Sequence, residues 1–170
     1  LVSLADVVAV VTLADERELG LPAEQEQRGE GSSPREVTLD VEQVLWKREG
    51  ATGSPPNRFK TFGLGYVYHD GKRFETEYAG SSDFQSGERY VVALIDYSHE
   101  PGTGPLGGWG TFSQGVIIPL EGDRLASQPE RGPIAVELAG HTLPEVTAQL
   151  SQTKPYPSAL AHPDHSATVR

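Results

Sequence analysis

Cysteine and methionine are both missing from this sequence of 170 residues. Without cysteine the chain forms no disulfide, holds no metal through a thiolate and has no thiol nucleophile. The first residue is Leu1 instead of a methionine, as expected after removal of a secretory signal or a lipid-anchor segment, or after an arbitrary trim. We favour export, so the protein is predicted to be extracytoplasmic, secreted or lipid-anchored, with a cytoplasmic location as the alternative.

Positive charge is scarce in this chain. Lysine and arginine together number 14 against 24 aspartates and glutamates, which gives a formal net charge of −10. Such a chain is a poor general binder of nucleic acid, because that affinity comes from basic side chains that release counterions. It is equally unsuited to an anionic membrane surface, and no window approaches the roughly 18 apolar residues of a membrane helix. We therefore expect no nucleic-acid partner and no insertion of this chain into a membrane.

What the sequence does contain is a series of short apolar runs typical of β strands. Residues 7–13 are continuously apolar and β-branched, which predicts a strand buried on both faces. Residues 37–42 alternate between apolar and polar, as in a half-buried strand, and the break in phase at residues 44–46 predicts a bulge or a bend. Residues 88–95 are the most apolar run and are assigned to the centre of the sheet. The acidic residues 15–36 are interpreted as a long solvated loop.

Two turn signals predict β-hairpins. Asp70 and Gly71 separate two alternating runs, residues 66–69 and 72–78, and an Asp-Gly pair suits a tight turn in which both residues have positive φ. A second hairpin is expected within residues 116–126.

One helix is expected near the end of the chain. Thr142 and Glu145 have the spacing of a capping box, with apolar residues at helical spacing after them, which predicts a helix over residues 143–152. Residues 155–170 contain little that could be buried and are interpreted as a flexible tail. Several strands, a single terminal helix and no β-α alternation predict one all-β domain spanning residues 1–154, either a barrel or a sandwich.

Motifs that would indicate catalysis or a cofactor are weak. Residues 102–107 match the letters of a dinucleotide-binding loop, but Pro105 removes one N–H donor and no helix is predicted to follow. Ser113 lacks the spacing of a nucleophile elbow. The run His162–His165 contains two imidazoles and a carboxylate, but it lies in the predicted tail, whose ordering opposes metal binding. We expect no cofactor and no metal site.

Asp6 is a carboxylate beside the first buried strand. Such a group is usually satisfied by backbone N–H groups or by an arginine, and Arg89 is the candidate partner. A small hydrolase is the alternative function, and it would require Asp6, His69, His99 or Glu75 to converge within hydrogen-bonding distance of one another.

Aromatic side chains provide the candidate ligand-binding residues. Trp109 lies in the glycine-rich residues 101–115, where an exposed ring could contact a protein partner or a glycan. Phe112 belongs to the same stretch, and Tyr66 and Tyr68 lie on the first predicted hairpin. These four aromatic residues are the predicted ligand contacts.

Three stretches together resemble bacterial exported OB-fold-like domains. Residues 3–11 (SLADVVAVV) are similar to the opening of such domains, residues 37–45 (VTLDVEQVL) to their second strand, and residues 87–94 (GERYVVAL) to a later strand. The likeness extends to netrin-like and tissue-inhibitor-of-metalloproteinase-like barrels, and residues 140–150 look like the terminal helix of actinobacterial members. The resemblance implies a Greek-key barrel with an appended helix. Inhibitors of this type chelate zinc through an N-terminal cysteine, and since Leu1 is not cysteine, no inhibitor activity is implied.

The combined expectation is an OB-like barrel of five to six strands with one C-terminal helix. Its predicted interior contains Val8, Val10, Leu39, Val41, Val92, Leu94 and Ile117. Because the motifs supply no convincing catalytic group, the predicted function is that of a non-catalytic binding or adaptor module for another envelope protein or a neutral glycan, since the charge disfavours a polyanion. A nucleic-acid-binding OB domain ranks last, because only Lys60, Lys72 and Arg73 approach a basic stripe.

Overall fold

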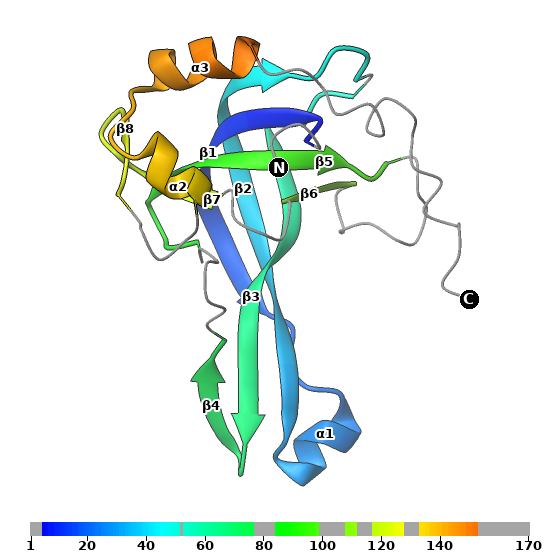
Figure 1. Ribbon diagram of the computed structural model, residues 1–170. Coiled ribbons are helices and arrows are strands. Elements are labelled where there is room, and N and C mark those ends of the chain that lie inside the picture. Colours follow the sequence, from blue (N-terminus) through cyan, green and yellow to red (C-terminus); the bar gives the residue numbers. More distant parts are fainter. Residues whose placement is uncertain are drawn as a thin grey trace, which may run out of the picture.

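The computed structural model shown in Figure 1 describes residues 5–51, 53–76, 84–98, 108–111, 117–127 and 133–152. The strands in these ranges are β1 (Val7–Glu18), β2 (Gly31–Lys47), β3 (Arg58–His69), β4 (Lys72–Glu75), β5 (Arg89–Asp96), β6 (Trp109–Thr111), β7 (Ile117–Glu121) and β8 (Arg124–Leu125). The helices are α1 (Ala23–Arg28), α2 (Pro133–Leu138) and α3 (Leu143–Ser151).

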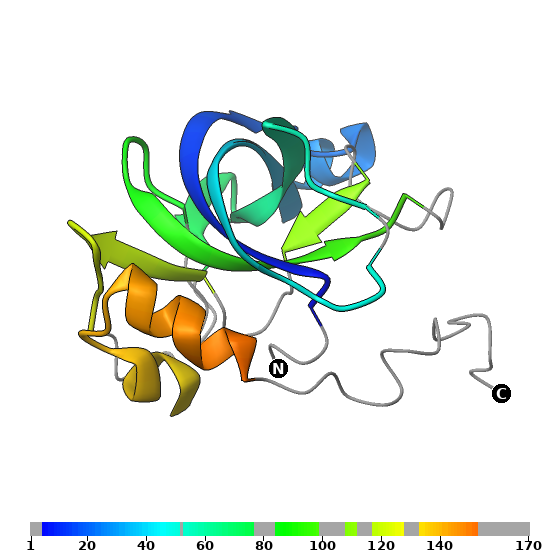
Figure 2. The same cartoon turned by 90° about the horizontal axis from the view of Figure 1, so that it is seen from above.

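The strands form one large antiparallel sheet. Their order is β4-β3-β2-β1-β5-β7-β8, and β6 pairs with β5 beside β7. Seen from above, the sheet curls round on itself (Figure 2), and this curl brings β6 close to β3. The expected mainly-β fold with a C-terminal helix is therefore confirmed. The expected five to six strands and single helix are too few, since the described residues contain eight strands and three helices.

Strand β1 is buried on both faces, as its continuous apolar run predicts. Val7, Ala9 and Val11 point into the curl of the sheet, where they belong to one apolar cluster. Val8 and Val10 point the other way, into a second cluster that includes side chains from α2 and α3. The alternation of a strand thus supplies two cores from one segment.

Helix α3 covers the second cluster. Its N-terminus has the predicted capping box, in which the Thr142 N–H donates to the Glu145 carboxylate at 2.7 Å. This backbone hydrogen bond is the first cause that lowers the pKa of Glu145. The apolar face of the helix, formed by Leu143, Val146 and Leu150, is buried.

Several local predictions are confirmed, and the prediction for the glycine-rich loop needs correction. The turn residues Asp70 and Gly71 have φ values of 50° and 70°, as the hairpin prediction requires. The predicted break in β2 is a bulge at Leu45, since Val8 pairs with Trp46 while the next residue of β1 pairs with Val44. The glycine-rich loop, however, contains the short strand β6.

The interior prediction holds for Leu39, Val92 and Leu94, which lie inside the curl, and is wrong for Val8 and Val10, which are buried on its outer face beneath α2 and α3. Five of the residues expected inside are buried, namely Val8, Val10, Leu39, Val92 and Leu94. Val41 and Ile117 are only partly buried and pack against the cluster inside the curl. The predicted tail, residues 155–170, lies outside the described residues.

The prediction of a solvated loop over residues 15–36 is wrong. Strand β1 continues to Glu18, helix α1 follows, and β2 begins at Gly31. The polar residues remain in strands because they pair across them, as in the ion pairs Arg17–Glu36 (3.3 Å) and Arg35–Glu16 (3.1 Å). Residues 15–36 show no alternation of apolar and polar side chains, which is the pattern that identifies a strand in a sequence.

These polar strands form a projecting arm. We use "the arm" for residues 15–36 and 62–75, which contain the far ends of β1, β2 and β3 together with α1 and β4. Figure 1 shows the arm extending downward from the curled part of the sheet, which we call the body. The arm ends at the turn between β3 and β4, far from helices α2 and α3.

Candidate functional site

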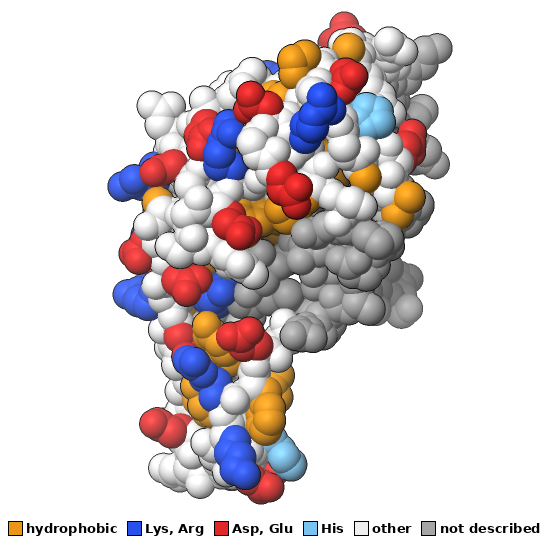
Figure 3. Space-filling view, turned by 90° about the vertical axis from the view of Figure 1, so that its left-hand side faces the viewer, with side chains coloured by type: hydrophobic (Ala, Val, Ile, Leu, Met, Phe, Trp, Pro, Cys, Tyr) orange, Lys and Arg blue, Asp and Glu red, His pale blue; other side chains and the backbone are white. Residues whose placement is uncertain are grey.

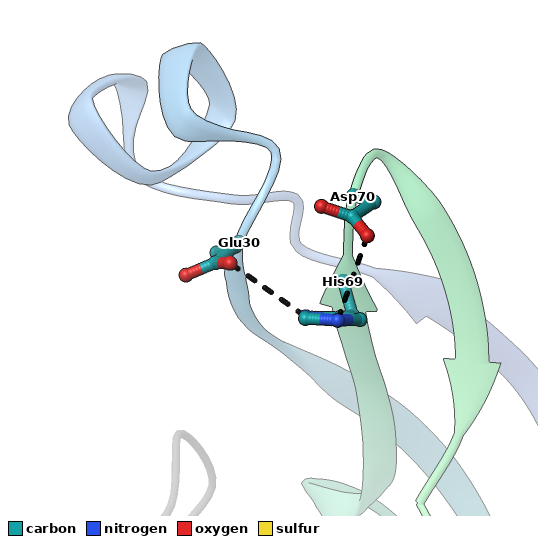
Figure 4. A group of neighbouring side chains, drawn as sticks. All are labelled: Glu30, His69 and Asp70. Carbon is teal, nitrogen blue, oxygen red and sulfur yellow. Dashed lines mark ion pairs between the residues drawn. The ribbon is translucent and has the colours of Figure 1, made fainter.

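Three side chains with metal-ligating chemistry meet at the tip of the arm. Glu30 precedes β2, His69 ends β3, and Asp70 lies in the turn that follows (Figure 4). The two segments are joined by a backbone hydrogen bond of 2.9 Å from the Gly71 N–H to the Gly29 carbonyl. The tip is therefore a defined structure, built by a two-residue turn packed on the end of α1.

The contacts within this cluster are long, and each carboxylate lies beside a different ring nitrogen of His69. His69 Nδ1 lies 3.6 Å from a carboxylate oxygen of Glu30, and its Nε2 lies 3.6 Å from a carboxylate oxygen of Asp70. The two nitrogen atoms face different acids, whereas a single cation would take only one nitrogen and would need both carboxylates to turn toward it. All three side chains are exposed, so water competes with every contact.

A second polar group lies on the arm around Tyr68. Its hydroxyl donates to Glu18 at 2.6 Å, and Arg73 lies 3.3 Å from the same carboxylate. The Tyr68 hydrogen bond is the largest cause that lowers the pKa of Glu18, and the same bond raises the pKa of Tyr68. The Arg73 guanidinium also lies over the Tyr66 ring, 4.5 Å from its centroid. The structure thus brings Tyr66 and Tyr68 together in contacts within the arm, and their role as ligand contacts stays a prediction.

The arm also exposes apolar side chains. Val67 of β3 and Phe74 of β4 are direct cross-strand partners, so they share one face, and they are 42% and 51% exposed. Phe62, farther back on β3, is exposed as well. Figure 3 shows hydrophobic side chains on the surface of the arm among lysine, arginine and acidic residues. A cross-strand apolar pair left in water is typical of a surface that meets a partner.

Strand β4 is the last strand of the sheet at this end. One side of it pairs with β3, and no other strand in the described part of the chain pairs with its second side. The N–H of Thr76, just after β4, donates to the Gly65 carbonyl at 3.1 Å. The even-numbered residues of β4 therefore direct their backbone groups toward β3, and Arg73 and Glu75 direct theirs to the open edge.

Trp109 occupies a different environment from the one expected. It begins β6, is only 5% exposed and packs in the cluster inside the curl of the sheet. The expectation of an exposed ring on a glycine-rich loop is therefore wrong, because pairing of β6 with β5 carries the side chain into the core. Phe112 lies outside the described residues.

Asp6 is satisfied in the way that its position suggests, but by another arginine. Its carboxylate forms an ion pair with Arg48 and accepts a 2.8 Å hydrogen bond from the Asp96 N–H. The candidate partner, Arg89, instead pairs with Glu42 at 2.8 Å. Asp6 therefore ties the start of β1 to the end of β5, which is a structural role.

The residues proposed for a hydrolase do not converge in the described structure. Asp6 is buried in the body beside Arg48, His69 lies at the tip of the arm, and Glu75 is exposed on β4. His99 lies outside the described residues. The three described residues of the proposed set are therefore far from one another, and the acids that His69 meets are Glu30 and Asp70 instead.

A cavity of about 440 Å³ opens beside β5 and β7. Its wall includes Tyr90, whose hydroxyl contacts Glu88 at 3.0 Å and the Gln85 N–H at 2.7 Å. Arg89, also in the wall, is held by Glu42, and this hydrogen bond is the first cause that raises its pKa. The polar groups of this wall stabilise one another and offer no nucleophile beside a base among the described residues.

No protein-family model, curated protein or solved structure matches this chain. Its function is therefore argued from its own residues. Among the helices that the structure describes, none has the length and apolar character needed to cross a membrane.

Proposed function

We propose that this protein is a non-catalytic binding module and that the arm is its contact surface. The observation that carries the proposal is the exposed pair Val67 and Phe74 beside the open edge of β4. The partner is an extended polypeptide segment, which would add to the sheet as a further strand.

The edge of β4 supplies the two kinds of contact that such recognition needs. The backbone groups of Arg73 and Glu75 face outward and give hydrogen bonds that do not depend on the partner's sequence. The Phe74 and Val67 side chains give an apolar contact beside those hydrogen bonds. The adjacent charges of opposite sign, on Arg73 and Glu75, set a preference for a partner with the complementary order.

The proposal extends to the body of the molecule. We propose that the curled sheet is an OB-like Greek-key barrel, which the closeness of β6 to β3 and the cluster inside the curl support. Nuclear Overhauser contacts between main-chain protons of β6 and β3 are expected in solution, and their absence from an assigned spectrum would contradict a closed barrel. The extracytoplasmic location stays a prediction.

The lack of cysteine makes a precise test possible, because a single introduced cysteine can carry a photo-reactive group. We expect Lys72→Cys, so labelled, to form a discrete adduct with a protein of the source cell, because the exposed position 72 lies on β4 beside an intact Phe74. The matched control is Val136→Cys on α2, since Val136 is 54% exposed and lies far from the arm.

The proposal has two further requirements. The adduct must contain an extended segment of the captured protein, identified by mass spectrometry, and unlabelled wild-type protein must compete for it more strongly than a Phe74→Thr variant does. Equal adducts from the two labelled positions, or none from position 72, would contradict the proposal.

A further inference from the structure

The open edge of β4 has a hydrogen-bonding pattern that restricts what can pair with it. The N–H of Thr76 points to β3, and the direction of the backbone N–H and C=O groups alternates along a strand. The backbone groups that face outward from β4 therefore belong to Arg73 and Glu75, two residues apart. An added antiparallel strand must place residues with outward-facing backbone groups opposite these two.

A second copy of β4 meets this requirement in a specific register. If two copies pair about a two-fold axis centred on Phe74, Arg73 of each copy lies opposite Glu75 of the other. Each of these two pairs exchanges two main-chain hydrogen bonds and places opposite charges side by side. Phe74 then faces Phe74 of the second copy across the axis, at a position where side chains approach closely.

The two neighbouring registers of self-pairing are unfavourable because they place like charges opposite each other. Shifting the axis to residue 73 places two arginines opposite each other, and shifting it to residue 75 places two glutamates opposite each other. The sequence Lys72-Arg73-Phe74-Glu75 therefore favours one self-pairing register, and in that register the exposed Phe74 becomes covered.

We propose that β4 is a self-recognition strand that pairs antiparallel with β4 of a second copy, centred on Phe74. The inference rests on the proposed role of the arm as a contact surface, and it names the partner. The body lies at the other end of the arm (Figure 1), so an antiparallel pair of arms keeps the two bodies apart. The paired strand is short, so the contact falls at the weak end of the range of protein interfaces and the dimer depends on concentration.

The test is sedimentation velocity over a series of protein concentrations with wild type and charge variants. Wild type is expected to show reversible dimerisation. In Arg73→Glu, each cross-strand pair of the dimer contains two glutamates, and in Glu75→Arg each contains two arginines. Each variant is therefore expected to raise the dissociation constant of the dimer by about tenfold or more.

Two controls separate pairing from a loss of arm structure, because Arg73 also contacts Glu18. The double variant R73E/E75R restores opposite charges in every pair and should dimerise again. An equimolar mixture of the two single variants should form a heterodimer, since one copy then contributes two acids and the other two arginines. Each single variant alone should stay monomeric at the concentration where the mixture dimerises.

Several results would overturn the inference. These are a wild type that stays monomeric up to millimolar concentration, a dimer unaffected by either single variant, or a mixture that fails to associate. If wild type is monomeric while the label at position 72 still captures another polypeptide, self-pairing is wrong and the proposed function stands. If the label captures nothing either, both are wrong.

Discussion

At the scale of single residues, the environment of a charge decides what it contributes. Asp6 and Arg48 form an ion pair that is largely out of solvent, and the carboxylate also accepts the Asp96 N–H. Asp40 and Arg58 form an ion pair of similar chemistry on the surface. Removing one member of a buried pair leaves an uncompensated charge, whereas water replaces a lost partner at the surface.

The residue Asp6 therefore provides the first prediction. Asp6→Ala is expected to lower the free energy of unfolding by about 3–5 kcal/mol, because Arg48 loses its buried partner. The control Asp40→Ala is expected to cost clearly less, because water replaces the lost partner at the surface. Urea denaturation followed by circular dichroism measures both values, and equal losses would contradict a buried role for Asp6.

At the scale of elements, the arm is stabilised by polar contacts that link its strands. Glu18 of β1 accepts from Tyr68 of β3 and pairs with Arg73 of β4, so one carboxylate connects three strands. The pKa of Glu18 is lowered by these contacts, the Tyr68 hydrogen bond first. The pKa of Glu18 is therefore lower in the folded than in the unfolded protein. Its contacts stabilise the arm fully at pH values above the unfolded-state pKa, and this stabilisation is lost as the pH falls through the folded-state pKa.

This network predicts a change with pH. In Tyr68→Phe the pKa of Glu18 should rise toward its ordinary value of 4.5, because its largest hydrogen bond is gone. The stability difference between wild type and this variant should be greatest near neutral pH and shrink in acid. The side-chain carboxyl carbon of Glu18, followed by NMR, gives the midpoint. The control Tyr66→Phe should leave the Glu18 midpoint unchanged. An unchanged midpoint in Tyr68→Phe would show that the Tyr68 hydrogen bond does not lower the pKa of Glu18.

A glycine in β3 permits the irregular pairing of the arm. The register between β2 and β3 shifts near Gly65, where a Cβ would clash with the backbone carbonyl of Ser33. Gly65→Ala should therefore lower the free energy of unfolding clearly more than Gly20→Ala does. The Cβ added at position 20 contacts no other atom, so that variant has only the cost of a positive φ, about 1 kcal/mol. Thermal unfolding compares the two, and a smaller cost at Gly65 would show that the shift does not depend on this glycine.

The sequence predicts elements well where hydrophobicity or turn chemistry specifies them. The runs that become β1 and β5, the Asp70-Gly71 turn and the capping box at Thr142 each carry a local signal, and each element is found. The strands within residues 15–36 carry no such signal, because their stability comes from partners on other strands.

The candidate site was harder to predict for a related reason. Phe74 lies in an alternating run, which suggests a half-buried position, and only the sheet order shows that β4 has no described neighbour on its second side. The burial of Trp109 likewise depends on β6 pairing with β5, a contact between segments that one short motif does not specify. The need of Asp6 for a partner was predictable, but the choice of Arg48 was not.

At the scale of the whole molecule, the body and the arm have different roles. The body buries the two apolar clusters on either side of β1 and β5. The arm has little core of its own, yet it carries the exposed pair Val67 and Phe74 and an open strand edge. We therefore attribute stability to the body and propose that recognition belongs to the arm.

Amide hydrogen exchange along β4 tests this assignment most directly. In dilute protein the Phe74 amide, which faces β3, should be protected, while the amides of Arg73 and Glu75 should exchange nearly as fast as in an unstructured chain. When the arm is occupied, at high protein concentration or with a captured partner, Arg73 and Glu75 should gain protection together. If these two amides are already protected in dilute protein, or gain none when a complex forms, β4 is not the contact edge.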